Sequence, residues 1–391
     1  MRLGPYGWAT LLGRLERIGL LKVLHVYRVY LPEDNTGIPR VIWNMAEGLL
    51  SRGVQSTVLA TSGAANGQRQ AVDGHSAKLA RRLFRIASVD VSLQLLALFR
   101  RLTRSADIVH YHFPWPVMDA LHLMAPPHCP TVVTYHADIV RQDAALPFYK
   151  PLRDRFLASA DRIVATSPQY VQTSPVLNQI SDGRLRMIPI GIGPRTTPSS
   201  ELIESWRRRV GKDFILFLGA ARYYKGLPIL MQAARATEAR IVLAGRGTEA
   251  AWERGGAPAN VTALGAISDA DREALIELSL AMVLPSHLRA EAFGVVLLEA
   301  ARAGKAMITA EIGTGTSYVN IHGVTGTIVP ASAPDALAGA MTQLTQNPEQ
   351  ARAFGANALA RYQEHFTAER MCAAHFELYE ELIAAQPARA A

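Results

Sequence analysis

The chain has 391 residues, more than the ~250 to 300 residues beyond which a single hydrophobic core usually stops growing. Hydrophobic residues make up 49% of it and charged residues 19%, a balance that excludes disordered, collagen-like and coiled-coil proteins. The formal net charge of +8 favours an anionic partner such as phosphate, nucleic acid or a membrane surface. The composition therefore predicts a globular protein of about two domains and excludes a single small module.

The cysteines and the apolar runs bear on where the protein works. Cys129 and Cys372 lie too far apart to indicate a disulfide framework or a cysteine zinc site, and they fit a reducing compartment. Charged residues from Arg14 onward interrupt the first apolar stretch before it reaches the length of a signal sequence. The pattern of residues 1–20 fits an interfacial helix, a plain surface helix or a segment that precedes the true start codon. We expect a cytoplasmic protein whose membrane association, if any, is peripheral.

Short apolar runs rich in Val and Ile alternate with helical patterns along the chain. Runs that are apolar on both faces are typical of a parallel sheet covered by helices. The predicted class is therefore α/β, with two doubly wound, Rossmann-like domains in succession. In chain order the expected strands are 22–28, 56–61, 107–111, 131–135, 162–166 and 185–190, then 214–219, 240–245, 261–264, 281–285, 305–309 and 326–329.

The domain boundary is expected where residues 191–200 combine Gly, Pro and Ser without periodicity. Because doubly wound sheets bind ligands at the carboxyl ends of their strands, both domains should face a central cleft. The predicted division is an N-terminal extension at 1–21, a first Rossmann-like domain at 22–190, a linker region at 191–212, a second Rossmann-like domain at 213–366, and a C-terminal helix and tail at 367–391.

The stretch from Lys78 to Arg104 contains seven cations and one acid, interleaved with Leu, Ile and Phe. This pattern predicts a basic amphipathic helix or helix pair. Such an element can lie on an anionic bilayer, or it can be a solvated face packed on the first sheet. No nucleic-acid-binding motif accompanies the charge, so a nucleic-acid partner is not expected.

Two groups in the second half follow strand ends. Arg222 and Lys225 come after the strand at 214–219, and together they can clamp a diphosphate whose charge grows as it departs. Glu291 and Glu299 frame the start of a helix expected near Phe293. On a helix their separation spans at most ~12 Å, about the distance from the sugar to the ribose of a nucleotide-sugar.

The glutamates at this helix start, and two residues of the first half, have more than one interpretation. The backbone amides of Phe293 and Gly294 are placed to meet a phosphate, whereas two Glu residues at a helix start also occur as ordinary capping and solvation. In the first half, Gly37 precedes a helix expected from Ile38 and lets the backbone approach a phosphate, or it serves as a simple turn. His136 ends a strand and faces substrate or is structural.

Metal and dinucleotide motifs are weak. His110 and His112 form an H-x-H without an evident third ligand, and Asp269 and Asp271 fit the acidic first turn of a helix. No G-x-G-x-x-G follows the first strand and no G-x-x-x-x-G-K-[ST] occurs. The sequence predicts no metal and no bound cofactor.

Taken together, the Gly37 loop, the Arg222 and Lys225 pair, the two glutamates and the two βαβ halves resemble the family 4 retaining glycosyltransferases of the GT-B fold. The resemblance runs from Lys22 to about Leu382. The segments that resemble bacterial O-antigen D-rhamnosyl- and mannosyltransferases most closely are HYHFPWPVMDALH, TYHADIVRQ, RYYKGL, PSHLRAEAFGVVLLE and EIGTGTSYVNIHG.

The resemblance implies transfer of D-rhamnose or mannose from a GDP-sugar to a polyprenyl-diphosphate-linked glycan, with retention and without a metal. It implies that the enzyme lies peripherally on the cytoplasmic face of an anionic bacterial membrane. It assigns acceptor binding to the domain at 22–190 and nucleotide-sugar binding to the domain at 213–366. Within the second domain it assigns diphosphate binding to Arg222 and Lys225 and ribose binding to Glu299. The remaining residues that it places at the reacting sugar or the donor site are Glu291, His136, Gly37, Phe293, Gly294, Thr314 and Gly315.

Thr36 stands where many members of the family have the first glycine of a pair, which weakens the expected phosphate contact of this loop. Two rival functions stay open at this point. One is a UDP-sugar-dependent transferase or a sugar-phosphate synthase on the same fold. The other is a catalytically silent subunit that binds a nucleotide or glycan, although retention of both cations and both carboxylates argues against it.

Overall fold

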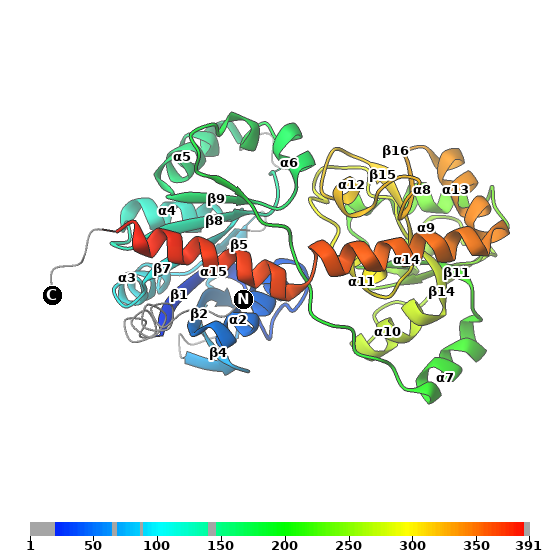
Figure 1. The fold of residues 1–391 in the computed structure, drawn as a ribbon, viewed down its shortest axis with the longest axis horizontal. Coiled ribbons are helices and arrows are strands. Elements are labelled where there is room, and N and C mark those ends of the chain that lie inside the picture. The colour runs from blue at the N-terminus through cyan, green and yellow to red at the C-terminus, as the bar shows by residue number, and fades with distance from the viewer. Residues whose placement is uncertain (1–19, 65–68, 87–88, 140–145, 387–391) are drawn as a thin grey trace, which may run out of the picture.

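The computed structural model describes residues 20–64, 69–86, 89–139 and 146–386, and it forms two lobes, each built on a largely parallel sheet (Figure 1). The predicted α/β class is confirmed, and each of the strands predicted from an apolar run is present. The helix considered within residues 1–20 lies outside the described residues except for its last position. Within the described ranges, no helix has the length and apolar character that crossing a membrane requires.

The first sheet has the order β10-β9-β8-β7-β1-β2-β4-β3, and only β3 runs antiparallel to its neighbour. A separate antiparallel hairpin, β5–β6, follows β4. The strands are β1 (Leu21–Val29), β2 (Val54–Ser62), β3 (Arg69–Val72), β4 (His75–Arg81), β5 (Phe84–Ile86), β6 (Val89–Val91), β7 (Ile108–Phe113), β8 (Thr131–Tyr135), β9 (Arg162–Ala165) and β10 (Leu185–Met187). The helices are α2 (Ile38–Gly48), α3 (Leu95–Thr103), α4 (Pro116–Met124), α5 (Leu146–Ser159) and α6 (Pro168–Thr173), with 3-10 turns at Leu50–Arg52 and Leu177–Gln179.

The second sheet is parallel throughout, in the order β13-β12-β11-β14-β15-β16. Its strands are β11 (Phe214–Leu218), β12 (Ile241–Ala244), β13 (Val261–Ala263), β14 (Ser279–Leu284), β15 (Ala306–Glu311) and β16 (Gly326–Pro330). The helices from the linker onward are α7 (Ser200–Val210), α8 (Leu227–Ala234), α9 (Thr248–Arg254), α10 (Asp269–Leu278), α11 (Val295–Arg302), α12 (Thr316–Val319), α13 (Pro334–Gln346), α14 (Pro348–His365) and α15 (Ala368–Ala384), with a 3-10 turn at Tyr223–Lys225.

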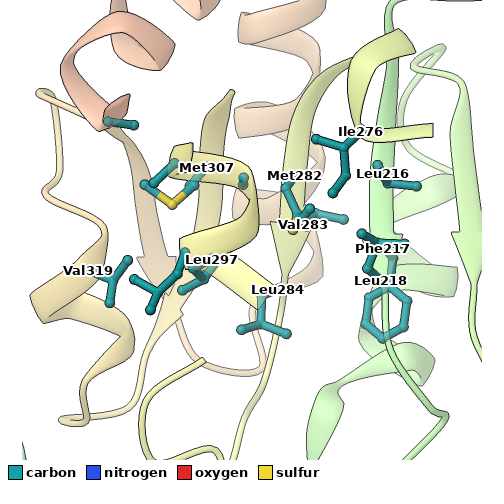
Figure 2. Close-up of a cluster of buried hydrophobic side chains, with 14 of the residues drawn as sticks. Leu216, Phe217, Leu218, Ile276, Met282, Val283, Leu284, Leu297, Met307 and Val319 are labelled. Carbon is teal, nitrogen blue, oxygen red and sulfur yellow. The ribbon is translucent and has the colours of Figure 1, made fainter. Parts of the chain in front are cut away.

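Helices cover both faces of the second sheet, so consecutive strand residues are buried. Leu216, Phe217 and Leu218 of β11 are each at most 3% exposed. Figure 2 shows them beside β14 side chains, with Met307 of β15 and Leu297 of α11 in the same cluster. This two-sided burial is why the strands could be recognised in the sequence as uninterrupted apolar runs.

The chain crosses between the lobes twice, and the two crossings lie side by side. The backbone amide of Ile192 donates to the carbonyl of Phe366, and the amide of Ala368 donates to the carbonyl of Ile192. A Cβ on Gly191 would lie 2.2 Å from the carbonyl oxygen of Thr367, so only glycine permits this approach. Beyond the crossing, α15 packs on the first lobe against α2 (Figure 1).

The prediction of a helix or helix pair over 78–104 is wrong for most of that stretch. The chain there forms the end of β4, the β5–β6 hairpin and only one helix, α3. β4 is a strand because it lies between β2 and β3 and is largely buried. The cations of the hairpin are paired: Arg82 contacts Glu33 at 2.5 Å, and Arg85 contacts the fully buried Asp90.

Candidate donor site at the strand ends

The strand order of each sheet reverses at one point, between β1 and β7 in the first and between β11 and β14 in the second. Doubly wound sheets bind ligands outside the carboxyl ends of the strands at this point. In the second lobe, Arg222 and Lys225 follow β11 and Glu291 follows β14. In the first lobe, Gly37 follows β1 and His136 directly follows β8, the neighbour of β7.

Lys225 and Glu291 form an ion pair across the switch point of the second sheet. The Nζ of Lys225 donates to Oε2 of Glu291 at 2.9 Å, and the two side chains are only 13% and 11% exposed. Burial alone would lower the pKa of Lys225, but the charge and hydrogen bond of Glu291 raise it above its usual value. Lys225 therefore stays protonated and provides a fixed, partly desolvated positive charge.

The two loops that carry this pair touch through their backbones. Gly226 has φ of 70°, and a Cβ at this position would lie 1.9 Å from the carbonyl oxygen of Pro285. Glycine is therefore required for the loop after β11 to approach the loop after β14. Arg222, three residues before Lys225, is exposed, and no hydrogen bond or ion pair joins its guanidinium to a described residue. Of the two predicted clamp cations, one is held by a carboxylate and the other is available.

The segments around Phe293 and Thr314 are hydrogen-bonded to each other next to Glu291 of the ion pair. Thr314 donates its hydroxyl to the backbone carbonyl of Glu291 at 2.8 Å, and the amide of Gly315 donates to the carbonyl of Ala292 at 2.8 Å. Phe293 points its ring into the core, where it is 3% exposed, so only its backbone can meet a ligand. The structure thus brings together the predicted site positions Glu291, Phe293, Thr314 and Gly315. Gly294 is the residue that caps the start of α11.

Glu299 lies apart from the Lys225–Glu291 pair, on α11. The helix begins at Val295, two residues later than predicted, because Gly294 has φ of 78° and is not helical. Glu299 therefore lies about one turn, not two, inside the helix. Its Oε2 is 3.5 Å from Nε of Arg272 on α10. Burial raises the pKa of Glu299 even though Arg272 and Arg302 oppose the shift.

The Gly37 loop of the first lobe ends in a helix start with open space above it. Gly37 has φ of 58°, precedes α2 at Ile38 as predicted, and a Cβ there would have no atom within 4 Å. Thr36 turns away from this space, since its hydroxyl and amide both donate to Oδ1 of Asp34 at 2.8 and 3.0 Å. The threonine in place of glycine is accommodated by this turn.

His136 belongs to a buried histidine cluster, and this is the main difference from the sequence prediction. His110 and His112, the H-x-H pair of the sequence, are fully buried beside it. His25 of β1 and His375 of α15 join them. Residues on both faces of β1 are buried, so no local pattern in the sequence marks His25 as a member of this cluster.

Metal binding by this cluster conflicts with the ring geometry. His25, His110 and His112 each have a ring nitrogen within 4.8 Å of the others, so a third potential ligand does exist. However, the rings of His110 and His112 are stacked at 4.5 Å with planes 17° apart. A metal must lie in the plane of each imidazole that ligates it, and two nearly parallel planes at this spacing share no such point. In addition, both ring nitrogens of His110 are engaged, by Tyr379 and Thr134.

The acidic pair on α10 has a structural role. Ser268 caps the helix and forms a capping box with Asp271, which also accepts a hydrogen bond from the indole of Trp206 at 2.8 Å. Asp269 pairs with Arg272 at 3.1 Å. The predicted acidic first turn is confirmed, with Ser268 rather than an aspartate at the capping position.

Arg289, which the sequence did not single out, joins the two lobes at the site. Its guanidinium donates to Oδ2 of Asp138 at 3.0 Å and to the hydroxyl of Thr173 at 2.8 Å, both in the first lobe. Arg289 precedes Glu291 by two residues, and Asp138 follows His136 by two. The loops that carry Glu291 and His136 are therefore held against each other by this link.

Two Rossmann-like domains, linked across their strand ends and carrying a buried cation–carboxylate pair at a switch point, define a protein of the two-domain, GT-B type. Comparison with known proteins agrees. Residues 35–195 match the family model described as Glycosyltransferase Family 4, and residues 199–361 match the model described as Glycosyl transferases group 1.

Individual relatives cover nearly the whole chain. The D-rhamnosyltransferase WbpZ of Pseudomonas aeruginosa is 46% identical over 89% of this chain and 93% of its own length. The O-antigen chain mannosyltransferase C of Escherichia coli is 41% identical over 93% of this chain and 99% of its own. Among solved structures, sucrose-phosphate synthase from Thermosynechococcus elongatus has a TM-score of 0.77 at 18% identity, with 94% of this chain and 100% of that chain covered.

The chain belongs to glycosyltransferase family 4, so the resemblance seen in the sequence is confirmed. It is therefore a glycosyltransferase. The likeness to the solved structure confirms the GT-B fold and, at its low identity, nothing beyond the fold. The roles of the individual site residues are still predictions.

Proposed function

We propose that the protein transfers D-rhamnose or mannose, with retention, from a GDP-sugar to a lipid-linked oligosaccharide of an O-antigen. The observation that carries this proposal is the buried Lys225–Glu291 pair at the switch point of the second sheet, with the exposed cation of Arg222 three residues from Lys225. The two relatives at 46% and 41% identity, named for D-rhamnose and mannose transfer, support the sugar class.

The chemistry needs positive charge at the leaving group. As the bond from the sugar to the diphosphate breaks, negative charge grows on the diphosphate, and preorganised donors stabilise it most in the transition state. Lys225 supplies a point charge and Arg222 a two-pronged donor. In a same-face mechanism the departing phosphate takes the acceptor proton, so that no protein base is required. Glu291, close to Lys225, is placed to contact the donor sugar.

A panel of nucleotide-sugars tests the proposal. Purified protein is incubated with GDP-D-rhamnose, GDP-mannose and the UDP-sugars in the presence of EDTA, and released nucleotide and product mass are measured. We expect turnover with a GDP-sugar. Turnover with UDP-sugars alone would establish the rival transferase, and binding without turnover of any donor would establish a silent subunit.

We propose further that the acceptor is carried on a polyprenyl diphosphate and that the first lobe rests on the anionic cytoplasmic face of the membrane. Leu93, Leu83 and Phe84 are 83%, 52% and 50% exposed, an unusual exposure for large apolar side chains in one short segment. On α3 and directly after it, Arg100, Arg101 and Arg104 are exposed. Apolar side chains flanked by cations are typical of an interfacial contact, at ~1 kcal/mol per cation near the surface.

The hairpin pairing decides which cations to change in a membrane test. Arg82 and Arg85 neutralise Glu33 and the buried Asp90, so reversing them would disrupt the fold. Charge reversal of the three arginines from 100 to 104 avoids this. We expect the variant with Glu at all three positions to lose binding to anionic vesicles while it still hydrolyses the donor. Vesicle binding of the wild type should weaken as the salt concentration rises. Unchanged vesicle binding in the variant would remove this surface from the proposal.

A further inference from the structure

A line of hydrogen-bonded imidazoles runs through the first sheet to His136. Nδ1 of His25 is 3.1 Å from Nε2 of His112, and Nδ1 of His112 is 3.0 Å from Nε2 of His136. At the far end, the hydroxyl of Ser56 is 3.4 Å from Nε2 of His25. The line therefore crosses four neighbouring strand positions, from β2 through β1 and β7 to the end of β8.

The three rings of this line are neutral at physiological pH. Burial, followed by the nearby histidines His75 and His375, lowers the pKa of His25 to about 3. Burial, followed by His375, lowers the pKa of His136 to about 3, and burial lowers that of His112 well below its usual value. A neutral imidazole has one N–H donor and one bare acceptor nitrogen.

The tautomers of the three rings are consequently coupled. If Nδ1 of His25 donates to His112, then His112 must carry its own proton on Nδ1 and donate to His136, whose proton is then on Nδ1. In the opposite arrangement, His136 and His112 carry their protons on Nε2 and donate back along the line. Ser56 satisfies either arrangement, because a hydroxyl both donates and accepts.

One nitrogen at the end of the line has no partner. Nδ1 of His136 is buried and makes no hydrogen bond with any described residue. Leaving a buried polar atom unpaired costs ~1 to 3 kcal/mol, and such atoms in native proteins call for an explanation, often a functional one. His136 lies two residues from Asp138, which binds Arg289 of the loop that carries Glu291. A ligand at this junction is placed to supply the missing partner.

We propose that His25 and His112 are positioning residues that hold the His136 ring and fix its tautomer, leaving Nδ1 as the single nitrogen that contacts a hydroxyl of the bound sugar. The proposal rests on the proposed function for the identity of that ligand. It involves no net proton transfer along the line. Instead, the coupled tautomers determine whether Nδ1 of His136 meets the hydroxyl as a donor or as an acceptor.

The first test reads the tautomer directly and needs no substrate. Protein labelled with ¹⁵N-histidine is studied by NMR in the resting state, where protonated and bare ring nitrogens have distinct shifts. We expect His112 and His136 to carry their protons on the same nitrogen in the wild type, both on Nδ1 or both on Nε2, and the tautomer of His136 to change in His112→Phe, which removes its partner. His112→Asn, whose amide takes approximately the place of Nδ1, is expected to restore the wild-type signal of His136. An unchanged His136 signal in His112→Phe would overturn the proposal, whatever the enzyme transfers.

The second test is kinetic and has a matched control. His110 is on the same strand, equally buried, and bonded to Tyr379 and Thr134 instead of to the line. We expect His112→Phe to lower kcat/KM for the donor ~10- to 100-fold, as loss of a partner that orients a functional imidazole does, with His112→Asn recovering most of it. His110→Asn should lose thermal stability but keep kcat/KM. Equal kinetic losses in His110→Asn and His112→Phe would show that both act only through stability.

Discussion

Lys225→Ala tests whether the ion pair at the second switch point serves catalysis or only the fold. The substitution removes the cation that lies 2.9 Å from Glu291 and leaves a carboxylate that is 11% exposed. Among the described residues, the Glu291 carboxylate has one other side-chain hydrogen bond, a long one from the hydroxyl of Ser286 at 3.4 Å. We therefore expect a loss of both stability and turnover, for different reasons.

The expected magnitudes follow from the burial of the pair. Removing one partner of a fully buried ion pair costs ~3 to 5 kcal/mol. The remaining exposure of the pair reduces this to ~1 to 3 kcal/mol, the usual cost of an unpaired buried group. In a chain of this size that lowers Tm by ~2 to 4 °C per kcal/mol. Loss of a donor to the departing diphosphate costs a further ~10²- to 10³-fold in kcat.

The double variant Lys225→Ala/Glu291→Ala separates the two effects. Removing the stranded carboxylate should recover part of the lost Tm, since no unpaired charge is then buried. Turnover should not rise above that of Lys225→Ala, because the cation is still absent. Calorimetry and single-turnover release of GDP measure the two outcomes. A double variant that regains stability and kcat together would refute a catalytic role for Lys225.

Three further outcomes are expected. Arg222→Ala should lower kcat ~100-fold or more while Tm changes little, since its exposed guanidinium has no ion pair with a described residue; normal turnover would remove it from the clamp. Turnover should be equal in EDTA and in Mg²⁺, and a loss that metal restores would reopen Asp269, Asp271 and the histidines as ligands. Because burial raises the pKa of Glu299, the folded state binds its proton more tightly than the unfolded state, so wild-type stability falls as pH rises from the unfolded pKa through the higher folded one. Glu299→Gln should lack this fall in denaturant titrations, and an identical pH dependence would contradict the burial argument.

The sequence predicted those strands whose two faces are both apolar. β11 is an example, because helices cover both sides and five consecutive residues are buried. The strands it missed, from β3 to β6, each carry a charged residue, so from β4 onward the side-chain pattern resembles a basic helix. What makes β4 a strand is its pairing with β2 and β3, and a long-range pairing leaves no local trace in the sequence.

The site was predicted where chemistry and position coincided. Arg222, Lys225 and Glu291 each follow a strand, and parallel strands bring their carboxyl ends to one edge. The contact between Lys225 and Glu291 joins residues 66 positions apart and needed the structure. The same holds for His25, which lies opposite His110 only because β1 pairs with β7 in that register.

The Arg289 link explains why neither domain alone defines the site. The lobes are joined by two adjacent crossings, at Ile192 and Phe366, so a rotation there would open the strand-end side. Any such opening must break the charge-assisted bond from Arg289 to Asp138, which is worth ~1.5 to 3 kcal/mol before solvent exposure reduces it. Because these residues flank Glu291 and His136, the bond holds the loop that carries Glu291 against the loop at the end of the histidine line. The alignment of the two loops therefore depends on how the two lobes are placed.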